Sequence, residues 1–519
     1  MKCRPVLSFC IPTYNRADKV YRCVTHILQY PGDEIEVVVS DNASSDDTLE
    51  RLGGINDKRL KVYSNKTNIL GLNWPLVVSY SAGMYAALMS DEDIVVLENI
   101  PYFIELLKEA YINKIGAVIY HFPYLVNIFN NYITKNAYES LKLAIRHGGH
   151  ITCHILNMDF YELFCDGDYE IASFENPHNE PQNEILLNLA ENNLVMLVKK
   201  PLCEYGFERI MSPKGDLDNF KYRMITQPAF SIERHCHEFL AYREHIIKSC
   251  DNMSSISNER QKELLLISVV LRLGTGLSMW LGSVINIDPE NYDLSAFPAN
   301  RAEAAKTFID FIETLFAQSR EVVKNSRLLQ FYEKATVSVI QQSYQESIPD
   351  ELDFIEKIRL GDFLYRIVQC FYLVFSFYGD GKLTSGYAND FDDILELKLT
   401  DRLYKMIQEK NFDGVINSTG ISSPRANYLK GQACMYKEDY SKAEYFFTQF
   451  LEALSNANTL SDILTGDSTV SHSYYYLGII NQKKGDTYKE LEFFAKSKKL
   501  TDELTIGAYL KPDWFSLEA

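Results

Sequence analysis

The feature that most constrains the fold is an alternation of strand-like and helix-like segments over the first hundred residues. The runs VLSFCIP (6–12) and EIEVVVSDN (34–42) are apolar and typical of buried strands. Between them, DKVYRCVTHILQY (18–30) has apolar residues at helical spacing, and RLKVYSN (59–65) and GMYAALMSDED (83–93) continue the alternation. This order predicts an α/β domain with a mainly parallel sheet covered by helices on both faces.

Polar residues gather where the predicted strands end. PTYNR (12–16) follows the first strand, SDNASSDDT (40–48) ends the second, and SDED (90–93) ends a later one. In an open α/β sheet, ligands bind beyond the carboxyl ends of the strands, because the connecting loops converge there. We therefore expect Asp41, Asp91 and Asp93 to lie along one edge of the sheet.

Three consecutive acids at residues 91–93 predict a cation site, with a solvated turn as the alternative. If this segment is extended, Asp91 and Asp93 point the same way and Glu92 points to the opposite face. Mg²⁺ and Mn²⁺ are commonly held by one or two carboxylates together with substrate phosphates. The net charge of −18 argues against a broad surface for nucleic acid, so an anionic ligand needs a local device such as a metal.

Four motifs in this order, SFCIPTYNR, VVVSDNASSDDT, NILGLN and SDED, resemble the family-2 glycosyltransferases of the GT-A fold. The resemblance covers about residues 4 to 205. It implies a GT-A, Rossmann-like mainly parallel sheet, a nucleoside diphosphate sugar as donor, Mn²⁺ or Mg²⁺ as cofactor, and inversion at the anomeric carbon. It also implies a glycan or lipid-linked saccharide as acceptor.

The resemblance assigns residues to the nucleotide-sugar pocket by their place in these motifs: Pro12, Tyr14, Asn15, Arg16, Asp41, Asn42, Ser44, Asn68, Gly71, Asn73, Asp91 and Glu92. Asp41 is expected to accept a hydrogen bond from the base. Asp93, and after it Asp91, are the expected metal ligands. Many relatives write the last motif as Asp-x-Asp-Asp, whereas Ser90 and Glu92 stand at its first and third positions here. The role of Glu92 therefore stays open between the ion, the ribose and neither.

The general base is harder to place. The acceptor hydroxyl must lose its proton as it attacks, which requires a nearby carboxylate or imidazole. Relatives usually carry Glu-Asp just before the helix that begins here near residue 185, and Pro181 and Gln182 occupy those positions. Glu180 is our first candidate and His178 the second, with Glu175 and Glu184 also close in the sequence.

Beyond about residue 215 the chain predicts helices only. Two segments, 428–454 and 475–500, share a Tyr-Leu-x-Gly-like start, a central turn containing Asp and a Phe pair, and resemble tetratricopeptide repeats. An unrelated helical bundle is the alternative. The expected domains are a glycosyltransferase domain (1–215), a helical domain (216–390) and a tetratricopeptide-like repeat domain (391–519).

The ten cysteines contain no C-x-x-C pair, and the first residues lack the layout of a signal peptide, which favours a reducing cytoplasm. The apolar segment 264–285 contains Arg272, so a buried helix pair is favoured over a membrane span. We expect a protein that is cytoplasmic or peripheral at the inner face of the membrane.

The sequence predicts a metal-dependent glycosyltransferase that extends a surface or capsular glycan, as in polysaccharide biosynthesis. The helical remainder is expected to mediate homo-oligomer or protein contacts, and no nucleic-acid partner is expected. The alternative is a non-catalytic sugar-nucleotide-binding scaffold that acts through its helical repeats, and Gln182 supports it. A nucleotidyltransferase is disfavoured, because no Gly-rich phosphate loop followed by Lys is found near the N-terminus.

Overall fold

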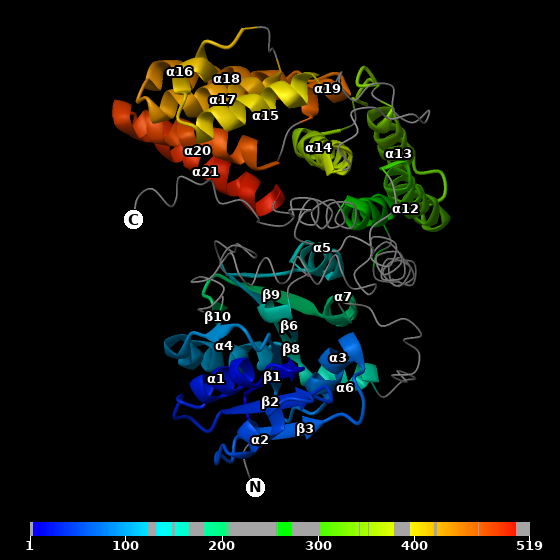
Figure 1. Ribbon diagram of the computed structural model, residues 1–519, viewed down its shortest axis with the longest axis vertical. Coiled ribbons are helices and arrows are strands. Elements are labelled where there is room, and N and C mark those ends of the chain that lie inside the picture. The colour runs from blue at the N-terminus through cyan, green and yellow to red at the C-terminus, as the bar shows by residue number, and fades with distance from the viewer. Residues whose placement is uncertain are drawn as a thin grey trace.

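The protein is described from a computed structural model (Figure 1). The residues that the structure describes are 4–122, 131–147, 151–165, 181–204, 206, 256, 258–271, 301–341, 343–350, 352–377, 395–419, 423–464 and 467–504.

An eight-stranded sheet forms the N-terminal part, in the order β3-β2-β1-β4-β8-β6-β9-β7. Strands β3, β2, β1 and β4 pair in parallel, whereas β8 runs antiparallel to both β4 and β6. The mainly parallel sheet is therefore confirmed. The strands are β1 (Leu7–Thr13), β2 (Ile35–Asp41), β3 (Leu60–Ser64), β4 (Tyr85–Leu88), β6 (Ile115–Tyr120), β7 (Tyr132–Ile133), β8 (His154–Asn157) and β9 (Leu194–Val198).

Every residue of the central strands β1 and β2 is buried. Continuous apolar runs of this kind are typical of strands that are covered on both faces. Pro12 lies inside β1, opposite Ser40, as the apolar run 6–12 predicts, so Pro12 is not part of the loop that follows the strand. The strand continues to Thr13, which lies opposite Asp41.

Helices cover both faces of this sheet, and Figure 1 shows α1 and α4 on one side with α3 and α6 on the other. A two-stranded antiparallel ribbon, β5 (Ile94–Val95) with β10 (Cys203–Glu204), continues from the 90–93 turn. The helices are α1 (Ala17–Ile27), α2 (Thr48–Gly53), α3 (Asn73–Ser79), α4 (Ile100–Ile112), α5 (Ala137–His147), α6 (Met158–Cys165) and α7 (Pro181–Asn192), with 3-10 turns η1 (Leu70–Leu72), η2 (Leu97–Asn99) and η3 (Ile151–Cys153).

In the described part of the chain after residue 206, the named elements are helices. One isolated β-bridge pairs Ser347 with Thr459. Figure 1 shows the yellow to red helices packed together at the end of the molecule farthest from the sheet. The helices are α12 (Arg301–Val322), α13 (Arg327–Ile340), α14 (Phe354–Phe377), α15 (Leu395–Gln408), α16 (Phe412–Ile416), α17 (Pro424–Tyr436), α18 (Tyr440–Ser455), α19 (Leu460–Ile463), α20 (Asp467–Lys484) and α21 (Thr487–Leu504).

The repeated sequence segments form two helical hairpins, α17 with α18 and α20 with α21. A Cβ added to Gly431 would lie 2.7 Å from the ring of Phe447, and one added to Gly478 would lie 2.6 Å from the ring of Phe494. In each hairpin, a glycine therefore lets an aromatic ring reach the partner helix. The Ser423 side chain accepts a hydrogen bond from the Ala426 amide and so caps α17, whose first residue is a proline.

Among the described residues, no helix combines the length and the apolar content needed to cross a bilayer. Residues 272–285 of the apolar segment considered above lie outside the described residues.

Candidate functional site

The loops that follow β1 and β2 are joined through Asn15. Its backbone has φ = 51°, a left-handed conformation that asparagine tolerates better than most residues. Its amide donates to Ser44 Oγ at 2.8 Å, and its side-chain oxygen accepts from the Ser45 amide at 2.8 Å. The loop residues expected from both motifs are therefore held against each other. Tyr14 extends from this loop with 44% of its surface exposed.

Asp41 ends β2 and is fully buried. Its carboxylate accepts hydrogen bonds from the Ser44 amide at 3.2 and 3.3 Å and from Ser64 Oγ at 3.1 Å. A base could contact Asp41 only if the loop that covers it moved. The expected hydrogen bond between the base and Asp41 stays a prediction.

Asparagines link the ends of β2 and β3 to the segment before α3. Asn42 donates to Asn68 Oδ1 at 2.8 Å and accepts from the Ile69 amide at 2.9 Å. Asn73, which is 2% exposed, accepts from Ser40 Oγ at 2.6 Å and donates to the Ser40 carbonyl at 2.8 Å. These side chains fix the loop that contains Gly71. Buried amides with satisfied hydrogen bonds therefore hold these strand-end segments in place.

Asn65 completes this network and was missed by the sequence reasoning. Its amide donates to Asn42 Oδ1 at 3.1 Å and to Asn73 Oδ1 at 2.9 Å. The available signal was its position directly after β3, where the strand-end rule also applies.

The acidic residues 91–93 form a turn, so the extended arrangement considered above does not apply to them. Strand β4 ends at Leu88, and the Asp93 amide donates to the Ser90 carbonyl at 3.3 Å. The three acids differ in exposure. Asp91 and Asp93 are buried, at 4% and 2% exposure, whereas the Glu92 side chain is 27% exposed.

Residues of β1 and α1 contact two of these acids. Asp91 accepts from Arg16 Nη1 at 3.0 Å and from Thr13 Oγ1 at 2.8 Å. Burial raises the pKa of Asp91, and the nearby Arg16 and Thr13 lower it in part. Glu92 lies 2.8 Å from both Lys19 Nζ and Arg16 Nη1. The sequence reasoning missed Thr13 and Lys19, although Thr13 is the last residue of its strand.

Asp93 is held by a residue that precedes β8, the strand that neighbours β4 on the side away from β1. Thr152, in the η3 turn before β8, donates to Asp93 Oδ2 at 2.5 Å and accepts from the Ser90 amide at 2.9 Å. One hydroxyl thus joins both ends of the acidic turn. Nothing in the sequence pattern indicated Thr152, because it is 59 residues from Asp93 along the chain.

Gly206 closes the turn from a third direction. A Cβ at this position would lie 1.6 Å from the Glu92 carbonyl oxygen, a distance at which no side chain can be accommodated without a backbone shift. The antiparallel pairing of β10 with β5 brings this part of the chain next to the acids. The turn therefore has a defined position set by β1, η3 and Gly206.

The donor set of this turn fits a divalent cation that is shared with phosphate. Asp91 and Asp93 supply hard carboxylate oxygens from a single turn. In the part of the chain that the structure describes, no group of three His, Cys, Asp or Glu side chains is placed to chelate a metal. Proteins usually bind Mg²⁺ through one or two carboxylates together with phosphate oxygens of the substrate. The residues present therefore suit an ion that binds together with a diphosphate.

The candidate bases Glu180 and His178 lie outside the described residues. A helix is present at this place in the chain, but α7 begins at Pro181 and not near residue 185, so Pro181 and Gln182 belong to its first turn and do not precede it.

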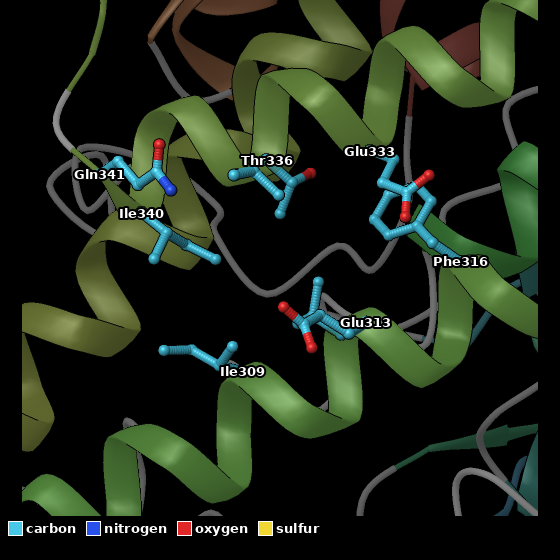
Figure 2. Close-up of a pocket in the computed structure, with 9 residues that line it drawn as sticks. Ile309, Glu313, Phe316, Glu333, Thr336, Ile340 and Gln341 are labelled. Carbon is cyan, nitrogen blue, oxygen red and sulfur yellow. The ribbon is translucent and has the colours of Figure 1, made fainter. Parts of the chain in front are cut away.

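A cavity of about 50 Å³ lies far from this edge, between α12 and α13. Figure 2 shows Ile309 and Glu313 of α12 facing Thr336 and Ile340 of α13. Sites for small-molecule ligands usually measure roughly 300 Å³ or more. This cavity is too small for a nucleotide sugar, so the sheet edge remains the candidate site.

Comparison with known proteins agrees with this assignment. Residues 8–162 match the family model Glycosyl transferase family 2. Over 119 residues the chain is 31% identical to the chondroitin synthase of Pasteurella multocida strain Pm70, and the hyaluronan synthase of Pasteurella multocida matches equally well. Each match covers 22% of this chain and only 12% of the synthase.

Solved structures also align at low identity. TarS of S. aureus, residues 1–349, is 15% identical and covers 67% of this chain and 94% of that chain, with a TM-score of 0.40. The mannosyltransferase PcManGT of Pyrobaculum calidifontis, solved with GDP-Man and Mn²⁺, is 15% identical and covers 63% of this chain and 89% of that chain, with a TM-score of 0.35. The segment 8–162, which carries the strand-end loops and the acidic turn, is a domain of glycosyl transferase family 2.

Proposed function

We propose that this protein transfers a sugar from a nucleoside diphosphate sugar to a hydroxyl group of a surface or capsular glycan. The observation that carries the proposal is the convergence of Arg16, Asp91 and Asp93 at one sheet edge inside a family-2 glycosyltransferase domain. We further propose that the transfer inverts the anomeric carbon. The acceptor is a glycan or a lipid-linked saccharide.

Asp93 and Asp91 are the proposed ligands of Mn²⁺ or Mg²⁺. The bound ion would neutralise charge on the departing diphosphate. Thr152 orients the Asp93 carboxylate, and Thr13 together with Arg16 orients that of Asp91. The Asn15 loop and the asparagine network around Asn42 shape the wall of the nucleotide pocket.

The acceptor hydroxyl needs a base, and Glu180 remains the first candidate with His178 the second. We also propose that the chain is divided into a glycosyltransferase domain (1–215), a helical domain (216–390) and a repeat domain (391–519). Contacts with other copies or proteins are assigned to the helices. The proposed location is the cytoplasm or the inner face of the membrane.

Gln182 favours a second candidate function, a scaffold that binds a nucleotide sugar without transferring it. It lies in the first turn of α7, where relatives carry an acid. A scaffold would still need the strand-end loops, but no base.

A panel of nucleotide sugars tests both candidates. The wild-type chain is incubated with each donor and with Mn²⁺, Mg²⁺ or EDTA, and release of nucleoside diphosphate is measured. Release that depends on the metal supports the transferase. Tight donor binding without release, with any acceptor, supports the scaffold, and a chain that neither binds nor hydrolyses any donor contradicts both.

A further inference from the structure

Arg16, which precedes α1, contacts two of the three acids in the turn at residues 90–93. Its Nη1 atom lies 3.0 Å from Asp91 Oδ1 and 2.8 Å from Glu92 Oε1. Lys19, in the first turn of α1, lies 2.8 Å from the same oxygen of Glu92. The negative charge of the turn is therefore balanced in part by two cations from the start of α1.

Both carboxylate oxygens of Asp91 have partners in the structure. Thr13 Oγ1 donates to Oδ2 at 2.8 Å, and Arg16 Nη1 donates to Oδ1 at 3.0 Å. Thr13 is the last residue of β1 and is 4% exposed, so the sheet fixes its place. The Arg16 side chain is 38% exposed and can turn toward solvent. An ion that binds Asp91 must therefore take the place of Arg16 on Oδ1.

Glu92 and the Asn15 loop keep Arg16 near the acids when it leaves Asp91. The Asn15 amide donates to Ser44 Oγ at 2.8 Å, which fixes the backbone directly before Arg16. The Glu92 side chain is 27% exposed and accepts from the guanidinium at the rim of the turn. A guanidinium carries five N–H donors in a planar fork, and this fork matches two oxygens of a phosphate group.

We propose that Arg16 exchanges partners when the donor binds: it holds Asp91 Oδ1 in the metal-free chain, yields this oxygen to the divalent ion, and then binds the diphosphate. A doubly charged ion attracts a buried carboxylate more strongly than a singly charged guanidinium does. Arg16 is then left beside the phosphate oxygens, while Glu92 keeps it in place. This inference rests on the proposed function, since the donor supplies the diphosphate.

The exchange predicts that Arg16→Gln changes two affinities of the full chain in opposite directions. Mn²⁺ without nucleotide should bind the variant at least about threefold more tightly than wild type, because Arg16 no longer competes for Asp91. UDP, GDP, ADP, CDP and dTDP are then tested with saturating Mn²⁺. The nucleoside diphosphate that binds wild type most tightly should bind the variant at least about tenfold more weakly, because a charged hydrogen bond is lost. Calorimetry measures both affinities.

Lys19→Gln is the matched control for the metal. It removes one positive charge from the same part of α1, but from a side chain that contacts Glu92. The affinity for Mn²⁺ should change less than about twofold. Equal tightening in Lys19→Gln and Arg16→Gln would indicate a general effect of charge and contradict the exchange.

Arg51→Gln is the matched control for the diphosphate. Arg51 of α2 is as exposed as Arg16, at 39%, and also pairs with two acids, Asp47 and Asp18. Its loss should leave the affinity for the nucleoside diphosphate unchanged. Thermal unfolding of every variant identifies any loss of fold, and Arg16→Lys, which keeps the charge, should retain part of the diphosphate binding.

Two results would overturn the exchange in a chain that still hydrolyses a donor, and both would leave the proposed function standing. Unchanged or weaker Mn²⁺ binding by Arg16→Gln would mean that Arg16 does not compete for Asp91. Tighter Mn²⁺ binding with unchanged diphosphate binding would mean that Arg16 does not receive the diphosphate. A wild-type chain that binds Mn²⁺ but none of the nucleoside diphosphates would overturn the proposed function and, with it, this inference.

Discussion

At the sheet edge, each acid of the 90–93 turn meets a partner from elsewhere in the chain, whereas in the helical hairpins Arg425 and His472 are desolvated beside tyrosines. Asp91 contacts Arg16 and Thr13, and Asp93 contacts Thr152. Arg425 meets an aromatic ring and no described carboxylate. The sheet edge therefore pairs its acids with residues from distant parts of the chain, while among the described residues the hairpins surround Arg425 and His472 with aromatic side chains.

Among the substitutions at the two regions, Asp93→Asn should have the largest effect, which is a loss of activity. If Asp93 holds the metal, kcat falls by about a thousandfold, because several kcal/mol of charge stabilisation in the transition state are lost. Steady-state release of nucleoside diphosphate measures it. Glu92→Gln, in the same turn but paired outward with Lys19, is the control and should cost less than about tenfold. Full activity of Asp93→Asn would exclude it as the metal ligand.

Acid should destabilise the hairpins through His472. Burial lowers the pKa of His472 to about 4 from an ordinary value of 6.5. Between these pH values the unfolded state binds more protons than the folded state, so stability falls as the pH drops. The free energy of unfolding should fall by roughly 3 kcal/mol across this window.

Denaturant unfolding at pH 7 and pH 4 measures this change, with His472→Gln as the control. Other groups titrate in both proteins, so the difference between them isolates His472. Equal losses in the two proteins would show that His472 is not desolvated in solution.

Thr152→Val tests whether the sheet edge depends on partners from the chain itself. The substitution keeps the shape of the side chain but removes the hydrogen bonds to Asp93 and Ser90. We expect a loss of about 2 kcal/mol in the free energy of unfolding, since a buried carboxylate loses a donor. Thr25→Val, an exposed threonine that bonds only to its own helix, should change stability far less. Similar values for the two variants would show that the Thr152 hydroxyl does not stabilise the acidic turn.

Gly431→Ala and Gly478→Ala compare the two hairpins with each other. Phe447 is fully buried and stacks on Tyr476 at 5.0 Å, so it has little room to move away from a new methyl group. Phe494 is only partly buried and can shift more easily. Gly431→Ala should cost about 1–3 kcal/mol, and Gly478→Ala less, as measured by chemical unfolding. A greater cost at Gly478 would show that the second hairpin is the more tightly packed.

We expect the smallest effect from Asp91→Asn, which changes how the free energy of unfolding depends on pH. The contribution of Asp91 to this pH dependence has the sign opposite to that of His472. The pKa of Asp91 is raised above 3.8 by burial, so the folded state binds more protons than the unfolded state just above this pH. Wild-type stability should therefore fall, relative to Asp91→Asn, as the pH rises from 3.8 through the raised pKa. A difference that rises with pH in this window would mean that Arg16 outweighs burial.

Much of the sheet edge could be predicted from local sequence. The apolar runs at residues 6–12 and 34–42 form β1 and β2, and their parallel pairing brings the loops after them together. Residues 91–93 are not extended, because β4 stops at Leu88, before the acids. The turn still separates Glu92 from its neighbours, since its side chain reaches Lys19 at the surface.

The partners of the acids could not be predicted. Thr13 and Asp91 are 78 residues apart, and Thr152 and Asp93 are 59 apart, so no local pattern links them. They meet because β4 lies between β1 and β8 in the sheet. The contact between Tyr428 and His472 has the same origin, because it depends on how the two hairpins stack.

The sequence by itself determined the type and the order of the elements in the N-terminal sheet, because strand and helix periodicity are local properties of the chain. It also carried the four motifs that match a glycosyltransferase family. Only the tertiary structure decided which buried charges are paired and which are left to aromatic neighbours. A carboxylate or guanidinium is partnered by whatever strand order and helix packing bring within hydrogen-bonding distance, and these contacts join residues that are distant in the chain.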